Sequence, residues 1–139
     1  MINAAVIGLG RWGKSIVNAV QGKSQRLRVI RGVSKEPDTV REFAATHRFE
    51  LSTEFADAVA DPRVETVMLA TPHSLHVDQI CAVAAAGKPV WCEKPLALTR
   101  LQAERAVAAC AKAGVVNPAT RPTISSRRVG VAMFMLSSP

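Results

Sequence analysis

The feature that most constrains this chain is an alternation of short β-branched apolar runs with longer stretches of helical periodicity. Such alternation is typical of β-α-β units wound around a parallel sheet. The run at 67–70 is apolar at every position, as expected of a central strand covered by helices on both faces. We therefore predict an α/β fold of the doubly wound type with one core, because 139 residues suit a single domain. The predicted strands are 4–8, 27–34, 64–70 and 89–92, and the predicted helices are 12–21, 37–46, 53–60, 75–86 and 99–113.

The last predicted helix has the clearest ends. Thr99 and Gln102 form a T-x-x-Q capping box, which satisfies free amide groups of a first helical turn. Gly114 is a natural residue just past the end of a helix. Regularity stops after Val116, where prolines and a polar, basic stretch follow. We therefore expect a folded domain over residues 1–116 and an irregular basic tail over residues 117–139.

Charge and composition argue against a nucleic-acid partner. The net charge is +7, but residues 1–114 carry only +4 of it and the last 25 residues carry +3. Aromatic residues make up 4% of the chain and tyrosine is absent, so the stacking surface of a single-strand binder is missing. The basic tail leaves salt-sensitive nucleic-acid binding as a weaker alternative, which deletion of residues 117–139 would abolish.

The chain also lacks the sequence signals of membrane or secreted proteins. No apolar run approaches the roughly 18 residues that a membrane span requires. No basic leader precedes the first apolar run, so we expect a cytoplasmic protein. The three cysteines are scattered through apolar stretches, which suits a reducing compartment and forms no zinc pattern.

A G-x-G-x-x-G motif occupies residues 8–13, directly after a predicted strand and at the start of a predicted helix. In this position the first glycine makes a tight turn, the second lets the backbone approach a pyrophosphate, and the third allows close helix packing. The helix N-terminus offers free amides and partial positive charge to the phosphates. The pattern thus predicts a dinucleotide site, with a ligand-free glycine turn as the alternative. The predicted contacts are Gly8, Leu9, Gly10, Arg11, Trp12 and Gly13.

The choice between the two nicotinamide cofactors depends on the end of the second predicted strand, about 20 residues further on. This segment reads Ser34-Lys35-Glu36. A hydroxyl and an ammonium, with no acid at the first position, favour a 2′-phosphate and therefore NADP over NAD. Glu36 keeps NAD open, because a small shift would bring its carboxylate to the ribose. All three residues are alternatively ordinary solvated turn residues.

Two more segments lie at predicted strand ends, where ligands of open parallel sheets bind. The first contains His73 and His76, which lack further ligands at suitable spacing, so we predict no metal site. The second contains Lys94 between Glu93 and Pro95, where the ammonium is placed to hydrogen-bond a substrate hydroxyl beside a nicotinamide. The alternative is a surface ion pair between Glu93 and Lys94, worth at most about 1 kcal/mol.

Three segments together resemble the N-terminal domain of the glucose-fructose oxidoreductase, inositol dehydrogenase and rhizopine-catabolism (Gfo/Idh/MocA) family. They are residues 6–13, 70–76 and 86–96, and the last contains Glu93-Lys94-Pro95, the most telling signature. The resemblance covers roughly residues 1–116. It implies a Rossmann domain that binds NADP or NAD and exchanges hydride with a sugar, a cyclitol or a related hydroxyl compound.

The resemblance also implies roles for single residues. Thr71, Pro72 and His76 line the nicotinamide end, and Lys94 contacts both cofactor and substrate. Position 73, often Asn in such proteins, is His here, so its contact stays open.

Members of this family carry a second α+β domain that supplies the substrate pocket, and no such domain is recognisable after residue 116. We therefore expect a truncation or frameshift that leaves a cofactor-binding but inactive chain, for which a polyol or sugar is a substrate only if a substrate domain is supplied. Translation of the coding DNA in its other two frames tests the frameshift. The alternative from another class is a non-catalytic cofactor-sensing or protein-interaction module.

Overall fold

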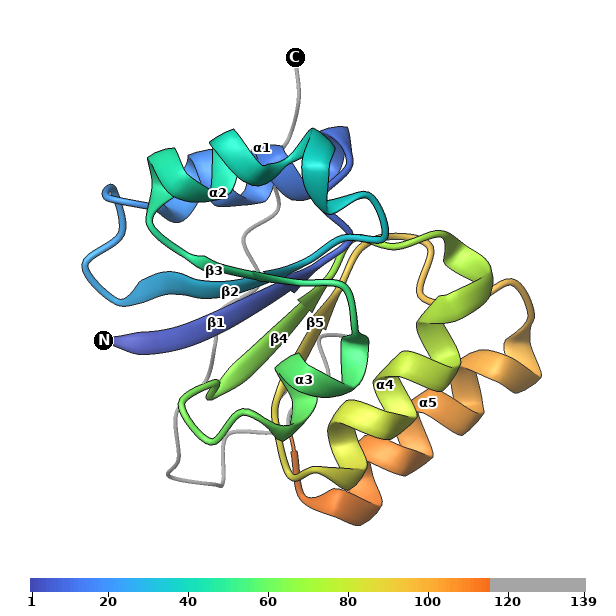
Figure 1. The fold of residues 1–139 in the computed structure, drawn as a ribbon. Coiled ribbons are helices and arrows are strands. Elements are labelled where there is room, and N and C mark those ends of the chain that lie inside the picture. Colours follow the sequence, from blue (N-terminus) through green and yellow to red (C-terminus); the bar gives the residue numbers. More distant parts are fainter. Residues whose placement is uncertain (116–139) are drawn as a thin grey trace.

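The strands form one parallel sheet (Figure 1). The structure is a computed structural model that describes residues 1–115, so the sequence prediction for residues 117–139 lies outside the described residues. Within that range the strand order is β3-β2-β1-β4-β5, and every neighbouring pair is parallel. The predicted Rossmann-like α/β fold is confirmed. The strands are β1 (Ile2–Ile7), β2 (Leu27–Val33), β3 (Glu50–Ser52), β4 (Thr66–Leu69) and β5 (Val90–Cys92).

Helices cover both faces of this sheet. Helices α1 and α2 lie together on one face, and α3, α4 and α5 lie on the other (Figure 1). No helix within residues 1–115 is long and apolar enough to cross a membrane. The helices are α1 (Arg11–Val20), α2 (Arg41–His47), α3 (Phe55–Ala60), α4 (His76–Ala85) and α5 (Arg100–Ala113), with 3-10 turns η1 (Pro37–Thr39) and η2 (His73–Leu75).

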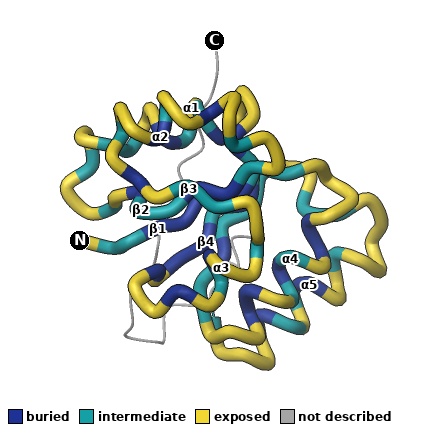
Figure 2. Tube along the Cα trace, viewed as in Figure 1, coloured by how far each residue is buried: buried dark blue, intermediate teal, exposed yellow. Residues whose placement is uncertain are grey.

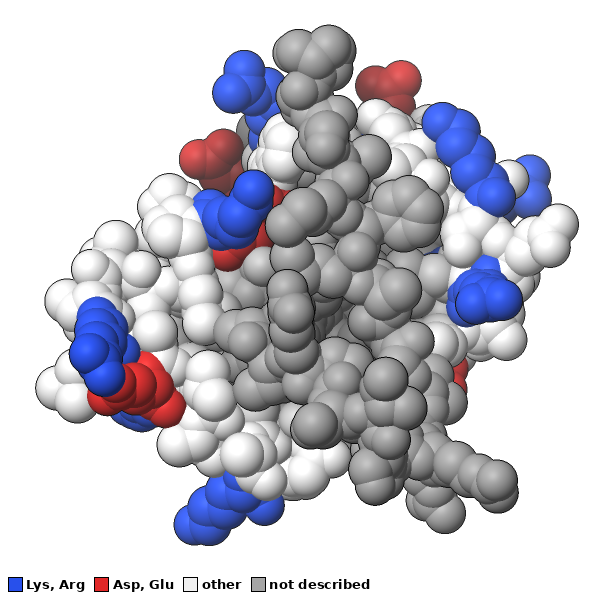
Figure 3. Space-filling model, turned by 180° about the vertical axis from the view of Figure 1, so that it is seen from behind, with Lys and Arg blue, Asp and Glu red and all other residues white. Residues whose placement is uncertain are grey.

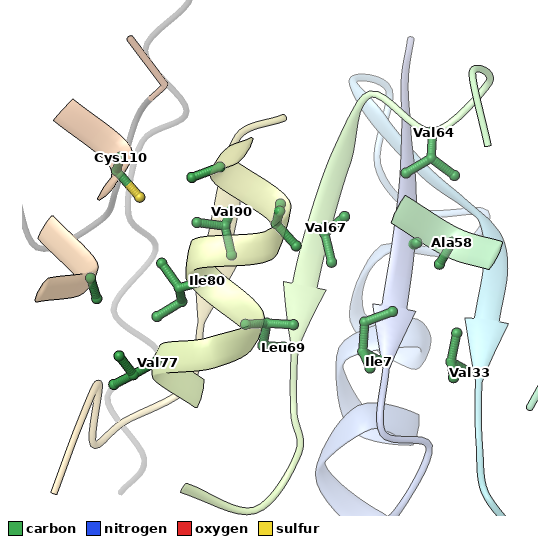
Figure 4. Close-up of a cluster of buried hydrophobic side chains, with 14 residues drawn as sticks. Ile7, Val33, Ala58, Val64, Val67, Leu69, Val77, Ile80, Val90 and Cys110 are labelled. Carbon is green, nitrogen blue, oxygen red and sulfur yellow. The ribbon is translucent and has the colours of Figure 1, made fainter. Parts of the chain in front are cut away.

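The two faces bury separate apolar clusters, because successive side chains of a strand point to opposite sides. On β1, Val6 belongs to the cluster under α1 and α2, whereas Ile7 belongs to the cluster under α3, α4 and α5. In the larger cluster, Ile80 of α4 lies beside Val67 and Leu69 of β4 (Figure 4). Figure 2 shows that β4 is buried at the centre of the fold, whereas the connecting loops are largely exposed. This packing holds the ends of β1 and β4 rigidly beside each other.

The strand order reverses its direction at β1. From β1 the chain proceeds outward through β2 to β3, then returns to the other side of β1 to form β4 and β5. Strands β1 and β4 are neighbours, but the loop after β1 leads to a helix on one face of the sheet and the loop after β4 leads to a helix on the other face. Such a reversal is where open α/β sheets bind ligands, outside the carboxyl ends of the strands.

The structure corrects three details of the sequence prediction. Strand β3 was not predicted; its three residues pair with β2 at the sheet edge. The predicted helix at 37–46 is divided at Val40, whose φ of −127° and ψ of 3° separate η1 from α2. The capping box before α5 is half confirmed: Thr99 Oγ1 accepts from the Gln102 amide at 3.2 Å, but Gln102 Oε1 accepts from the Leu98 amide at 3.2 Å.

An ion-pair network joins β2 and β3 to the turn before β4. Asp61, whose side chain is nearly buried, accepts from Arg31 at 2.9 Å and from Arg63 at 2.8 Å. Both arginines also bind Glu50, each at 2.7 Å. These hydrogen bonds, chiefly those from Arg63, hold the pKa of Asp61 far below its ordinary value. The Asp61 carbonyl oxygen also accepts from Lys88 Nζ at 2.6 Å, which ties this turn to the start of β5.

Basic side chains are dispersed over the part of the surface that one view shows. On the face seen in Figure 3, lysine and arginine side chains stand apart from one another, some of them beside acidic side chains. Arg41 pairs with Asp38 at 2.6 Å and Arg100 with Glu104 at 2.7 Å, both on exposed surface. The absence of a nucleic-acid partner stays a prediction.

Candidate cofactor-binding site

The loop between β1 and α1 depends on glycine at two positions for steric reasons. Gly8 has a φ of +89°, and a Cβ atom there would lie 2.7 Å from the carbonyl oxygen of Ala70. A Cβ atom on Gly13 would collide with the carbonyl oxygen of Gly8. These glycines let the loop fold tightly between β4 and the first turn of α1.

Gly10 is different, because a Cβ atom there would meet nothing within 4 Å. It is the N-cap of α1 and has no side chain to cap the helix, and the first turn of α1 contains no acidic residue. No capping side chain therefore accepts a hydrogen bond from the amides at the start of this ten-residue helix, and an external acceptor can do so. The space next to Gly10 is therefore open at the point where α1 begins.

The remaining residues of the loop divide by burial. Arg11 and Trp12 are exposed, and 51% of the surface of Trp12 is accessible. Leu9 is only 3% exposed and packs in the cluster under α1 and α2. Leu9 can therefore contact a ligand only through its backbone.

The segment after β2 lies at the same edge of the sheet. Ser34 is half-buried; its amide donates to the Ser52 carbonyl at 3.0 Å, and its Oγ accepts from the Glu36 amide at 3.2 Å. Lys35 and Glu36 are both exposed. The serine is thus held by backbone contacts, whereas the ammonium and the carboxylate project from the same turn. This placement leaves both cofactor interpretations open.

The segment after β4 is anchored at its base and exposed beyond it. The Ala70 amide donates to the Ile7 carbonyl at 2.8 Å, and Thr71 Oγ1 donates to Gln79 Oε1 of α4 at 2.6 Å. Pro72 and His73 are exposed. Sequence reasoning missed Gln79, because a polar residue on a helix gives no signal distinguishing it from a solvated one.

The segment after β5 lies beside the segment after β4. The Glu93 amide donates to the Leu69 carbonyl at 3.0 Å, and the Lys94–Pro95 peptide bond is cis. Lys94 is exposed, and within residues 1–115 the structure contains no ion pair between Glu93 and Lys94. The structure therefore does not contain the surface ion pair that was the alternative for these two residues.

His76 occupies a different place from the one its sequence position suggested. Its imidazole is 0% exposed, with Nδ1 2.9 Å from the Pro95 carbonyl oxygen and Nε2 2.9 Å from the Thr71 carbonyl oxygen. Both ring nitrogens therefore face the protein's own backbone. The ring lies between the segment after β4 and the segment after β5, where it has no free nitrogen to offer a ligand.

The cysteine and histidine side chains near the site are potential metal ligands. Within the described part of the chain no group of three or more potential ligands comes together. Cys81 and Cys92 are free cysteines. Burial, with a smaller contribution from the Glu93 carboxylate, raises the pKa of Cys92 to about 12, so this side chain is a neutral thiol at physiological pH.

Comparison with known proteins gives the same fold. An inositol 2-dehydrogenase from Rhizobium meliloti is 34% identical over 112 residues, covering 80% of this chain and 32% of that protein. The crystal structure of the WlbA dehydrogenase from Bordetella pertussis, in complex with NADH and UDP-GlcNAcA, matches with a TM-score of 0.76 and 30% identity over 82% of this chain and 35% of that one.

A second similar structure contains the other cofactor. KijD10, a 3-ketoreductase from Actinomadura kijaniata in complex with TDP-benzene and NADP, matches with a TM-score of 0.76 and 26% identity over 83% of this chain and 36% of that one. The chain spans a third or less of the length of the curated relatives it matches.

A family model described as the oxidoreductase family with an NAD-binding Rossmann fold matches residues 2–119. That range includes the glycine loop, the segment after β4 and the segment after β5. Homologous structures contain NAD or NADP, which confirms the predicted class of cofactor. The chain therefore belongs to the Gfo/Idh/MocA family of oxidoreductases and carries its NAD-binding Rossmann fold.

Proposed function

We propose that the cofactor lies along the carboxyl edge of the sheet, with its pyrophosphate on the first turn of α1. The observation that carries this proposal is the open space at Gly10, in front of a helix start that has no side-chain cap and no acid. Backbone amides and the helix dipole favour an anion there. Gly8, Gly10 and Gly13 shape the cradle, Arg11 and Trp12 border it, and Leu9 contributes its backbone.

We propose that the nicotinamide end lies against the segments after β4 and β5. Thr71 and Pro72 border it from one side, Glu93 and Lys94 from the other. When bound, the nicotinamide supplies the hydride acceptor or donor. Lys94 is the catalytic residue: its ammonium hydrogen-bonds the substrate oxygen and stabilises negative charge that develops there.

The substrate class we propose is a sugar, a cyclitol or a related compound with a reactive hydroxyl-bearing carbon. Support comes from similar proteins, which include an inositol 2-dehydrogenase and a dehydrogenase in complex with a nucleotide sugar. These relatives are about three times as long as the matched region. We therefore propose that the 139 residues bind cofactor but do not turn over a polyol by themselves, because positioning of the substrate contributes much of the catalysis of a bimolecular step.

We further propose a preference for NADP over NAD. The turn after β2 offers the hydroxyl of Ser34 and the exposed ammonium of Lys35, which suit a 2′-phosphate. Glu36, exposed on the same turn, is the residue that would favour NAD. The ratio of the NADPH affinity to the NADH affinity shows whether Lys35 or Glu36 determines the preference.

Titration of the purified chain with NADPH and with NADH, followed by calorimetry and coenzyme fluorescence, tests the proposal. We expect both to bind, NADPH more tightly, and no turnover with a panel of polyols. A Lys94→Met variant should keep the melting temperature, because the side chain is exposed, and should weaken coenzyme binding. If a folded sample captures neither coenzyme at millimolar concentration, the proposed function is wrong. Coenzyme-dependent association with another protein, without hydride transfer, would instead indicate a sensing module.

A further inference from the structure

The buried imidazole of His76 joins two loops that belong to different strands. Water does not compete for its ring nitrogens, because the residue is 0% exposed. Its two contacts are both with carbonyl oxygens, at 2.9 Å from Thr71 after β4 and at 2.9 Å from Pro95 after β5. A carbonyl oxygen only accepts hydrogen bonds, so each contact is a hydrogen bond only when that ring nitrogen carries a hydrogen.

A neutral imidazole carries a hydrogen on one nitrogen and a lone pair on the other. In this geometry the lone pair would face a carbonyl oxygen at hydrogen-bond distance, which is repulsive. Donation from both nitrogens, in contrast, satisfies both carbonyl oxygens.

The charged and titratable groups on the surrounding elements are few. The His73 ring of η2 lies 5.5 Å from the His76 ring, edge to face. On α4, Asp78 is engaged with Arg105 of α5 at 2.9 Å. On the segment after β5, Cys92 is a neutral thiol, and Glu93 and Lys94 precede Pro95.

The two tied segments are those assigned above to the nicotinamide end. At their base they share one backbone hydrogen bond, from the Glu93 amide to the Leu69 carbonyl at 3.0 Å. Beyond it, His76 is the bridge that connects the Thr71 backbone to the Pro95 backbone. Lys94 is bonded directly to Pro95, so a fixed Pro95 carbonyl restricts where the Lys94 ammonium can reach. A misplacement of about 1 Å at such a group can cost on the order of a hundredfold in rate.

We propose that His76 is a positioning residue that donates from both ring nitrogens, ties the segment after β4 to the segment after β5, and so holds Lys94 at the nicotinamide end. This inference rests on the proposed function for the role of Lys94. The tie itself is a property of the protein without cofactor.

Nuclear magnetic resonance of the full chain with ¹⁵N-labelled histidine tests the tie directly. The chain has three histidines, and the variants His47→Gln and His73→Gln assign the remaining signals to His76. We expect both ring nitrogens of His76 to carry hydrogens that exchange slowly with solvent at neutral pH. A single protonated nitrogen overturns the proposal, whether or not the protein binds a coenzyme.

Hydrogen exchange and coenzyme titration test the positioning role. His76→Leu removes both donors, His76→Gln keeps one amide donor, and His73→Leu is the matched control on the exposed neighbour. We expect amides in 71–75 and 93–97 to exchange about tenfold faster in His76→Leu, with β1 unchanged, partial recovery in His76→Gln and no change in the control. Coenzyme affinity should fall by about tenfold, since binding must then order both segments.

The outcomes separate the two proposals. If exchange in both segments stays at the wild-type rate in His76→Leu, the tie is wrong even when coenzyme binds normally. If the wild type binds no coenzyme, the proposed function fails, and the positioning role of His76 fails with it. If His76→Leu does not fold, the nitrogen signals of the wild type and the exchange rates of His76→Gln decide the question.

Discussion

Replacement of Gly10 by alanine should separate cofactor binding from folding. The residue has a φ of −67° and a ψ of −168°, which alanine adopts without strain, and its Cβ atom would meet nothing within 4 Å. Alanine is a poorer N-cap than glycine by about 1 kcal/mol. It also lowers the entropy of the unfolded chain, which stabilises by about 0.4–1 kcal/mol. The two effects nearly cancel, so we expect a melting temperature within a few degrees of the wild type.

The same methyl group should weaken coenzyme binding, because it projects into the space in front of the α1 amides. A phosphate kept from close approach loses at least one hydrogen bond to a charged acceptor, worth about 2 kcal/mol. That loss corresponds to an increase of about thirtyfold in Kd. Both NADPH and NADH should be affected alike, since the pyrophosphate is common to them.

Coenzyme fluorescence and calorimetry measure the affinity, and thermal unfolding measures the stability. Gly22→Ala is the control: it also lies in open space, but at the far end of α1 and with a φ of +73°. It should destabilise the fold by about 1 kcal/mol and leave Kd unchanged. A Gly10→Ala protein that binds NADPH within about twofold of the wild type would refute the assignment of the pyrophosphate to this helix start.

Three further changes test other parts of the structure. Gly13→Ala should lower the free energy of unfolding by about 3 kcal/mol in chemical denaturation, because its Cβ atom collides with the Gly8 carbonyl. Lys35→Gln should weaken NADPH binding by about tenfold and leave NADH binding unchanged in parallel titrations, since only NADPH carries the 2′-phosphate. Hydrogen bonds from Arg63 lower the pKa of Asp61 on folding, so its contribution to stability is full above the ordinary pKa of 3.8 and is lost as pH falls below it. Asp61→Asn should therefore lower the melting temperature by several degrees at pH 7 and by progressively less towards pH 2; equal losses at both would contradict this linkage.

Much of the fold could be predicted because the sequence patterns are strong and local. The apolar run at 67–70 lies in the buried centre of the sheet, and helix α5 begins after Thr99 and ends before Gly114, as their capping preferences predict. The glycine motif lies between a strand and a helix, as predicted. Two of its glycines have backbone neighbours that exclude a side chain, so the motif is required by the local packing.

What the sequence did not predict depends on partners far away in the chain. Strand β3 is three residues long and exists through its pairing with β2, which no local pattern specifies. His76 looked like a ligand-facing residue because it follows a strand end. Its environment is set instead by Thr71, five residues before it, and Pro95, nineteen residues after it, and only the tertiary fold brings these together.

The placement of the site follows from how closely two backbones approach at the reversal of strand order. Gly8 lies so near Ala70 that a Cβ atom would be 2.7 Å from its carbonyl oxygen, so the loops after β1 and β4 touch at their base. Above that contact the chain turns into α1 on one face and towards α4 on the other, so the loops diverge. A side chain is excluded at Gly8, whereas a Cβ atom at Gly10 would meet nothing within 4 Å. In the proposed binding mode, a ligand contacts backbone amides at the start of α1 and reaches the loops after β4 and β5. A dinucleotide, which is long and anionic at its middle, suits that mode better than a compact ligand does.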